Sequence, residues 1–163
     1  MLNTSGKNIG KDLAAGVGVG HTDISVARTS LYMDLREVGW RNVTALAFAA
    51  TLAPPETLTV TLMQATSSGG AAAKAVGSPV VVTARDNGAS PPGDVAVSAS
   101  VGADISDLDT DNGFYFVAVR VQSNAASAGG GVLLSNAPRF TGGTGDAYGA
   151  TQKIVDENNA IVG

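Results

Sequence analysis

The segment Asn112–Asn124, with the sequence NGFYFVAVRVQSN, constrains the fold more than any other part of the chain. In a β-strand, one of its faces would carry Tyr115, Val117, Val119 and Val121, and the other would carry Phe114, Phe116 and Ala118. Both faces are therefore apolar as far as Arg120. A strand that is apolar on both faces needs partner strands at each side and a second layer, which predicts the middle of a β-sandwich.

Alternating or β-favouring segments recur along the chain and supply the partner strands. The sequence predicts them at residues 31–36, 43–52, 58–65, 80–85, 95–101 and 132–140. Between them lie turn signals: Pro54 and Pro55, the glycine-rich AASAGGG, and Asn112–Gly113, which ends an acidic loop. Residues 71–76 predict at most one helical turn, and Pro138 predicts an edge or a bend in the last strand. The pattern predicts an all-β fold, an antiparallel β-sandwich of jelly-roll or Greek-key type.

Composition agrees with a single small-residue core. The chain has 163 residues, 21 of them glycine, and only 5% are aromatic, so Val, Ala and Leu must fill the interior. It has no cysteine, which excludes disulfides and thiolate metal sites.

The chain ends differ from this middle part. Residues 1–30 are rich in Gly, Asn and Ser and predict a flexible N-terminal arm, either a disordered terminus or an arm that orders on a neighbouring subunit. Residues 31–141 form the predicted sandwich, and residues 142–163 a C-terminal tail. No segment has a secretory signal or the roughly 20 apolar residues of a membrane helix, so we expect a protein made in the cytoplasm without membrane contact. The net charge of −4 is spread along the chain and does not predict a nucleic-acid partner.

Candidate catalytic and cofactor sites are weak. His21 is the one histidine, and its place in the arm leaves it without a nucleophile to activate, so we expect no catalytic residues and no histidine zinc site. Gly16, Gly18 and Gly20 lack the strand and helix of a dinucleotide loop, and no cofactor is expected.

The acidic loop is the segment with the strongest metal-site pattern. Asp107, Asp109 and Asp111 have the spacing that begins a calcium loop. The glycine then comes one position late, at Gly113, and Ala118 occupies the place of the closing glutamate. A solvated acidic hairpin turn is the preferred interpretation, with calcium as the alternative.

Partner contacts are predicted mainly from the arms. Arg120 lies in the most apolar strand and must reach solvent, a carboxylate or a partner subunit. Trp40 is either a core or rim packing residue, which is the preferred interpretation, or an exposed platform for a sugar or base. The predicted partner-binding residues are Asn8, Lys11, Leu13, Trp40, Arg120 and Ile154.

Four segments together resemble a group of small structural proteins found on or near the head of tailed bacteriophages. They are DLREVGWRNVTALAFAATL, LTVTLMQATSSGGAAAKAVG, ADISDLDTDNGFYFVAVRVQSN and GVLLSNAPRF, within residues 31–141. The resemblance is to capsid decoration, or cement, proteins. It implies a β-sandwich that binds the outside of the major capsid protein shell, commonly as a trimer.

We therefore expect a non-enzymatic virion protein on the capsid exterior that stabilises the capsid by bridging major capsid protein subunits, as a homo-oligomer with a trimer favoured. The alternative is a tail or fibre component, such as a receptor- or glycan-binding β-sandwich module.

Overall fold

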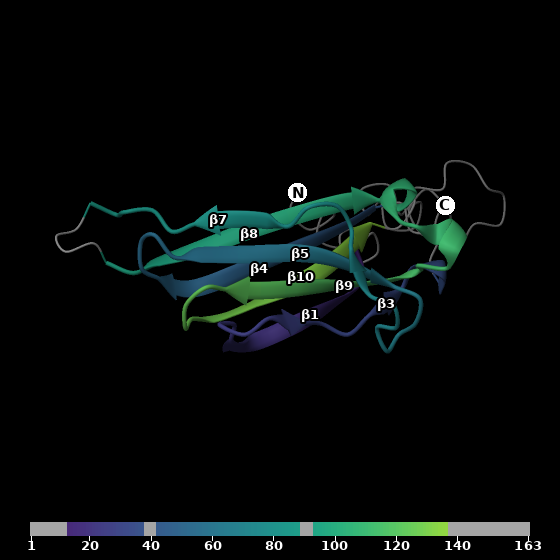
Figure 1. Ribbon diagram of the computed structural model, residues 1–163, viewed down its shortest axis with the longest axis horizontal. Helices are drawn as coiled ribbons and strands as arrows, with labels where there is room; N and C mark the ends of the chain where they lie inside the picture. The colour runs from purple at the N-terminus through teal and green to yellow at the C-terminus, as the bar shows by residue number, and fades with distance from the viewer. Residues whose placement is uncertain (1–12, 38–41, 89–92, 137–163) are drawn as a thin grey trace, which may run out of the picture.

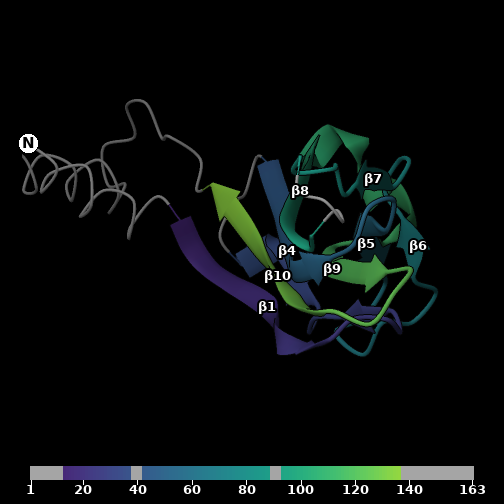
Figure 2. The same ribbon diagram turned by 90° about the vertical axis from the view of Figure 1, so that its left-hand side faces the viewer.

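The computed structural model of the chain describes residues 13–37, 42–88 and 93–136 (Figure 1). Within these residues the chain forms ten β-strands and three 3₁₀ helices, and the strands make two antiparallel sheets. Figure 2 shows the sheets as two facing layers. The predicted all-β antiparallel sandwich is confirmed.

The first sheet, which we call sheet A, has four long strands. Its order is β1 (Leu13–Asp23), β10 (Ala128–Asn136), β4 (Asn42–Leu52) and β8 (Val95–Asp104). Each neighbouring pair is antiparallel.

The second sheet, sheet B, is built on two central strands, β9 (Phe116–Ser123) and β5 (Thr57–Ala65). Short strands flank them. Beside β9 lie β2 (Arg28–Thr29) and β3 (Met33–Asp34), and beside β5 lie β6 (Lys74–Ala75) and β7 (Val80–Thr83).

The strand order is that of a jelly roll. Because β2 and β3 share one neighbour, and β6 and β7 share another, each pair occupies one position in its sheet. When the resulting eight positions are numbered along the chain, their order is 1-8-3-6 in sheet A and 2-7-4-5 in sheet B. Every connection between positions crosses from one sheet to the other, except the one from β5 to β6. This is the double Greek key of a jelly roll.

The core confirms that β9 is a central strand. Val117, Val119 and Val121 are fully buried and face sheet A. On the same side of sheet B, Leu58, Val60 and Leu62 of the neighbouring strand β5 are also fully buried. On the opposite face of β9, Ala118 is also fully buried. Arg120 is exposed, so the apolar character of that face ends where the sequence predicts.

The last strand differs from its prediction. AASAGGG was expected to be a turn, but β10 begins at Ala128 and includes all three glycines. It also lies inside sheet A, between β1 and β4, and not at an edge. The alternative prediction, a bend at Pro138, falls outside the described residues. A Cβ on Gly131 would lie 2.7 Å from the Val121 side chain and 2.9 Å from the Leu46 carbonyl oxygen. Glycine is therefore present because the two sheets approach closely there.

The prediction of a flexible N-terminal arm over residues 1–30 is wrong for the part that the structure describes, which begins at residue 13. Residues 13–23 form β1, and Ile24 is fully buried. An edge strand is held by backbone hydrogen bonds to one neighbour, so a glycine-rich sequence without an apolar period can form it. The rest of the arm, residues 1–12, and the predicted tail, 142–163, lie outside the described residues.

Two other local predictions are wrong. The strand expected at 31–36 is reduced to β3, because the Asp34 carboxylate accepts hydrogen bonds from the Arg36 backbone and guanidinium and the chain turns into a 3₁₀ helix, Leu35–Glu37. The helical turn at 71–76 is absent: Lys74 and Ala75 form β6, after a turn with Gly70 at φ +78°.

The acidic loop is not a hairpin. It joins β8 of sheet A to β9 of sheet B through two 3₁₀ helices, Ile105–Asp107 and Thr110–Asn112. Gly113 ends the second helix at φ +84°, where a residue without Cβ is favoured. The Asn-Gly signal thus correctly marks a left-handed residue but not strand pairing.

Candidate functional site

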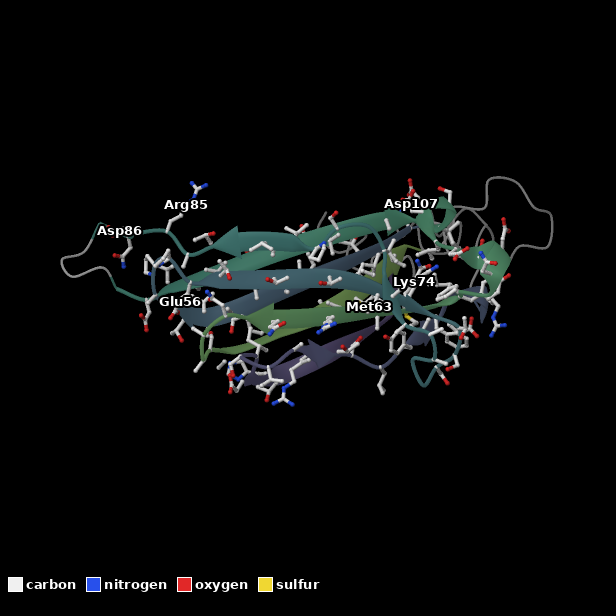
Figure 3. All side chains as sticks on the ribbon, viewed as in Figure 1. Glu56, Met63, Lys74, Arg85, Asp86 and Asp107 are labelled. Carbon is white, nitrogen blue, oxygen red and sulfur yellow. The ribbon has the colours of Figure 1, made fainter. Side chains whose placement is uncertain are left out.

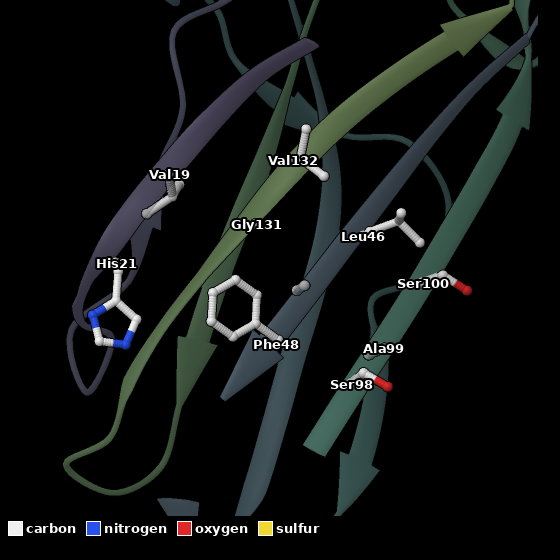
Figure 4. Close-up of a pocket in the computed structure, with 10 residues that line it drawn as sticks. Val19, His21, Leu46, Phe48, Ser98, Ala99, Ser100, Gly131 and Val132 are labelled. Atoms are coloured by element: carbon white, nitrogen blue, oxygen red, sulfur yellow. The ribbon is translucent and has the colours of Figure 1, made fainter. Parts of the chain in front are cut away.

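The outward side of sheet A exposes large apolar side chains at its centre. Leu46 and Phe48 of β4 are 38% and 45% exposed. The strands beside β4 place Val132 and Ser100 level with Leu46, and Ser98 level with Phe48 (Figure 4). Gly130 of β10 is also level with Phe48. We call this surface, defined by His21, Leu46, Phe48, Ser98, Ser100 and Val132, the apolar face.

A shallow groove of about 650 Å³ runs over the apolar face. The residues that line it include no Asp, Glu, Lys or Arg. His21 of β1 stacks on Phe48 across the groove, with ring centroids 6.2 Å apart and planes inclined by 18°. A contiguous exposed apolar surface on a soluble domain is typical of a binding interface.

The inward side of β4 explains why its large residues point outward. Ala45, Ala47 and Ala49 face the core and are buried. Ala47 and Ala49 are level with Gly131 and Gly129 of β10, where the close approach of the sheets leaves room only for small side chains. A register shift after Ala49 then turns Leu52 inward, where it is fully buried. Leu52 therefore lies on the opposite side of β4 from Leu46 and Phe48. The apolar face itself was missed; the triple glycine of the neighbouring strand was the signal for it.

The three aspartates of the proposed calcium loop serve different contacts. Asp107 Oδ2 accepts a hydrogen bond of 2.9 Å from the Asp104 backbone N–H. Asp109 accepts hydrogen bonds from Lys74 Nζ and from Asn112, and Asp111 is exposed. Among the described residues, no group of three or more His, Cys, Asp or Glu side chains could hold a metal ion.

Lys74 links the acidic loop to sheet B. Its ammonium forms an ion pair with Asp109 and lies 3.9 Å from the centroid of the Phe114 ring. The hydrogen bond from Lys74, followed by the one from Asn112, holds the pKa of Asp109 below its ordinary value of 3.8. Gln64 of β5 adds a hydrogen bond of 3.0 Å from the Asp109 N–H. These contacts fix the crossing between the two sheets.

Arg120 lies on the outward side of sheet B, level with Thr29 and Thr61. Because its side chain is exposed, its charge is solvated and the sandwich contains no buried arginine at this position. Nearby Tyr32 has its pKa raised by burial, an effect that the charge of Arg120 opposes.

Of the other predicted partner-binding residues, the structure describes only Leu13. Leu13 begins β1 and pairs with Asn136 at one end of sheet A. Asn8, Lys11, Trp40 and Ile154 lie outside the described residues. His21, expected to be an incidental arm residue, lies instead on β1 at the apolar face.

Charged side chains gather toward the two ends of the sandwich. Figure 3 shows Glu56, Arg85 and Asp86 toward one end and Lys74 and Asp107 toward the other. The groove over the centre of the apolar face is lined by no Asp, Glu, Lys or Arg. A surface of this kind favours contact by shape and apolar packing more than by charge.

Comparison with known proteins adds no relative: no protein-family model matches the chain, and no curated protein matches it significantly. Over the described ranges, none of the helices has the length and apolar character needed to cross a membrane. The resemblance to phage decoration proteins stays a prediction.

Proposed function

We propose that this chain is a non-enzymatic structural protein that binds the outside of a tailed-bacteriophage capsid and stabilises it by bridging major capsid protein subunits. The apolar face carries this proposal, because an uncharged apolar surface on a closely packed sandwich suits contact with another protein. The resemblance of residues 31–141 to capsid decoration proteins supplies the capsid as the partner.

Bridging needs no chemical step. A protein that contacts two or three capsid subunits adds an interface that must break before the subunits separate, and an interface of roughly 1,200 to 2,000 Å² is enough for stable association. In a homo-oligomer each copy adds an attachment point, so moderate individual affinities combine into tight binding.

The ends of the described chain support a bridging role. Leu13 pairs with Asn136 at the same end of sheet A, so residues 1–12 and 137–163 are joined to the sandwich at neighbouring positions. We propose that these two segments contact the capsid. Residues 13–30 belong to the sandwich and its core, so only residues 1–12 of the predicted arm are left for this role.

The test is attachment to purified capsids that lack this protein. We expect the full chain to saturate a fixed number of sites per capsid and to raise the temperature at which capsids rupture. A variant with residues 1–12 replaced by a Gly/Ser sequence of equal length should keep the unfolding temperature of the full chain and lose occupancy at least tenfold.

The controls separate the two parts of the proposal. A second variant with the same Gly/Ser sequence appended before Met1 should attach like the full chain. If the full chain leaves capsids bare at micromolar concentration, the capsid function is wrong. Equal occupancy for the replaced and full chains would instead remove the role of residues 1–12.

A further inference from the structure

Strand β8 forms a long edge of sheet A. Among the described residues its one neighbouring strand is β4, and no backbone hydrogen bond joins Val95–Ala103 to any other segment. In an antiparallel pair, every second residue of an edge strand directs its N–H and C=O away from its neighbour. The backbone of β8 therefore offers a row of donors and acceptors along a strand of ten residues.

The other edges of the described sheets carry features that oppose the addition of a strand. At the far edge of sheet A, β1 has two register shifts against β10, which make that edge irregular. Sheet B ends in the short strands β2, β3, β6 and β7, of two to four residues each. By contrast, β8 keeps an unbroken register with β4 from Val97 to Asp104 and contains no Pro, Lys or Arg. Of these edges, β8 is therefore the one best suited to pair with another strand.

The inward side of β8 is incompletely covered. Val95, Val101 and Ala103 pack against the core but are only half-buried, whereas Val97 and Ala99 between them are buried. A strand added beside β8 would place its inward side chains next to these residues, at the strand spacing of about 4.8 Å. Apolar, β-branched side chains there would extend the core and remove this surface from water.

The outward side of β8 leaves space beside the large residues of β4. Leu46 and Phe48 are exposed, and the small residues Ser100 and Ser98 lie level with them on β8 (Figure 4). An added strand would lie about 10 Å from β4, on the far side of the serines. Because the serines are small, large apolar side chains of that strand can lean across them and contact Leu46 and Phe48. The apolar face therefore favours a segment with such side chains at alternate positions.

The charges at the ends of β8 decide between a second copy and another protein. Asp94 precedes the strand and Asp104 ends it; both are exposed, and no charged residue lies between them. Antiparallel pairing of two β8 strands over their full length would place Asp94 of each copy opposite Asp104 of the other. Like charges in such cross-strand positions are destabilising. A segment with a basic residue at each end would instead place opposite charges beside both carboxylates.

We propose that the β8 edge binds an extended segment of another protein, which adds a fifth strand to sheet A. The segment carries large apolar side chains at alternate positions and Lys or Arg at both ends. Main-chain hydrogen bonds supply the affinity of such strand addition, and alternate side chains supply its specificity. This inference rests on the proposed function only in treating the apolar face as a protein-binding surface, and it adds the edge and the kind of partner.

The test is hydrogen exchange of the full chain, followed by NMR, with the synthetic peptide KVLTFTLVK blocked at both termini. The peptide has lysine at each end, and its sequence is the same in both directions, so it serves for parallel and antiparallel pairing alike. We expect saturable binding at micromolar concentration and exchange at least tenfold slower at alternate amides of β8. The amides of β1, at the other edge of sheet A, should keep their exchange rates.

A modified peptide is the control for backbone pairing. N-methyl groups on its three central residues keep the side chains but block pairing at both edges of the peptide, because successive N–H groups of a strand point to opposite edges. This peptide should leave exchange in β8 unchanged.

Variants of the chain test the side-chain contacts. Phe48→Ala should weaken binding of the unmodified peptide about tenfold, as for a central interface residue, while Val81→Ala on β7 of sheet B should not. Ser100→Lys places on β8 a charge of the kind that protects natural edge strands, and should also weaken binding about tenfold. Thr22→Lys adds the same charge to β1 and should keep the wild-type constant. Unfolding temperatures verify that each variant is folded.

Unchanged exchange in β8 at about 1 mM peptide would overturn the inference, as would slower exchange at β1 in its place or equal binding of the N-methylated peptide. Slower exchange in β8 that follows the concentration of the chain alone would assign the edge to a second copy and also overturn it. A chain that binds the peptide but leaves capsids bare would refute the capsid function alone. A chain that coats capsids but does not bind the peptide would refute this inference alone.

Discussion

Replacing Gly131 with alanine tests the close approach of the two sheets. The added Cβ would lie 2.7 Å from Val121 Cγ2 and 2.9 Å from the Leu46 carbonyl oxygen, both inside van der Waals contact. Val121 is fully buried, and the carbonyl belongs to the neighbouring strand of sheet A, so neither can move without disturbing the core. Overpacking of this kind costs about 1–3 kcal/mol, and the backbone contact places Gly131→Ala near the upper end, at about 2–3 kcal/mol.

The assay is urea unfolding followed by far-UV circular dichroism, with thermal unfolding beside it, at one fixed protein concentration. For a domain of this size, a loss of about 2–3 kcal/mol lowers the melting temperature by roughly 4–12 °C. Gly20→Ala is the matched control, because a Cβ there would have nothing within 4 Å. It should be neutral or stabilise the fold by up to about 1 kcal/mol. Equal midpoints for the two variants would refute the claim that the sheets require glycine at residue 131.

The remaining predictions concern two contacts of sheet B. Because the pKa of Asp109 is lowered in the folded chain, mainly by the Lys74 hydrogen bond, its stabilising contribution is present above pH 3.8 and is lost as the pH falls through the folded pKa. Lys74→Met should therefore flatten the decrease of unfolding free energy on acidification, and an unchanged acid profile would contradict this role. Ser30 Oγ accepts the Val119 N–H at 3.1 Å in a buried position, so Ser30→Ala should cost about 1–3 kcal/mol in urea unfolding, whereas Ser25→Ala at an exposed turn should cost less than about 1 kcal/mol.

The sequence was sufficient to predict the sandwich because the strands with the clearest apolar patterns are also the strands with a fully buried side. In such a strand, burial decides which residues face the core. Val117, Val119 and Val121 occupy every second position of β9, and Leu58, Val60 and Leu62 occupy every second position of β5. All six side chains are fully buried. The alternation of Ala96, Ser98 and Ser100 with Val95, Val97 and Ala99 likewise predicts the exposed side of β8.

The failures have a common cause, which is that backbone packing between distant segments leaves little trace in local pattern. The β10 glycines, taken alone, predict a turn. Only their contact with the valines of β9 shows why a strand needs glycine at these positions. The apolar face was missed for the same reason, since β4 has apolar residues on both sides and only the narrow space between the sheets decides that the alanines point inward.

The position of β10 between β1 and β4 also has a consequence for biosynthesis. Sheet A stays divided until Ala128–Asn136 has been translated, which is 76 or more residues after β4 ends at Leu52. At the usual rates of translation this delay is on the order of 10 s, during which the facing edges of β1 and β4 have no partner on the nascent chain. Unpaired edges are templates for pairing with other chains. On a crowded polysome, neighbouring nascent chains would compete with β10 for those edges, so the yield of native protein depends on ribosome spacing and chaperone supply as well as on the stability of the finished fold.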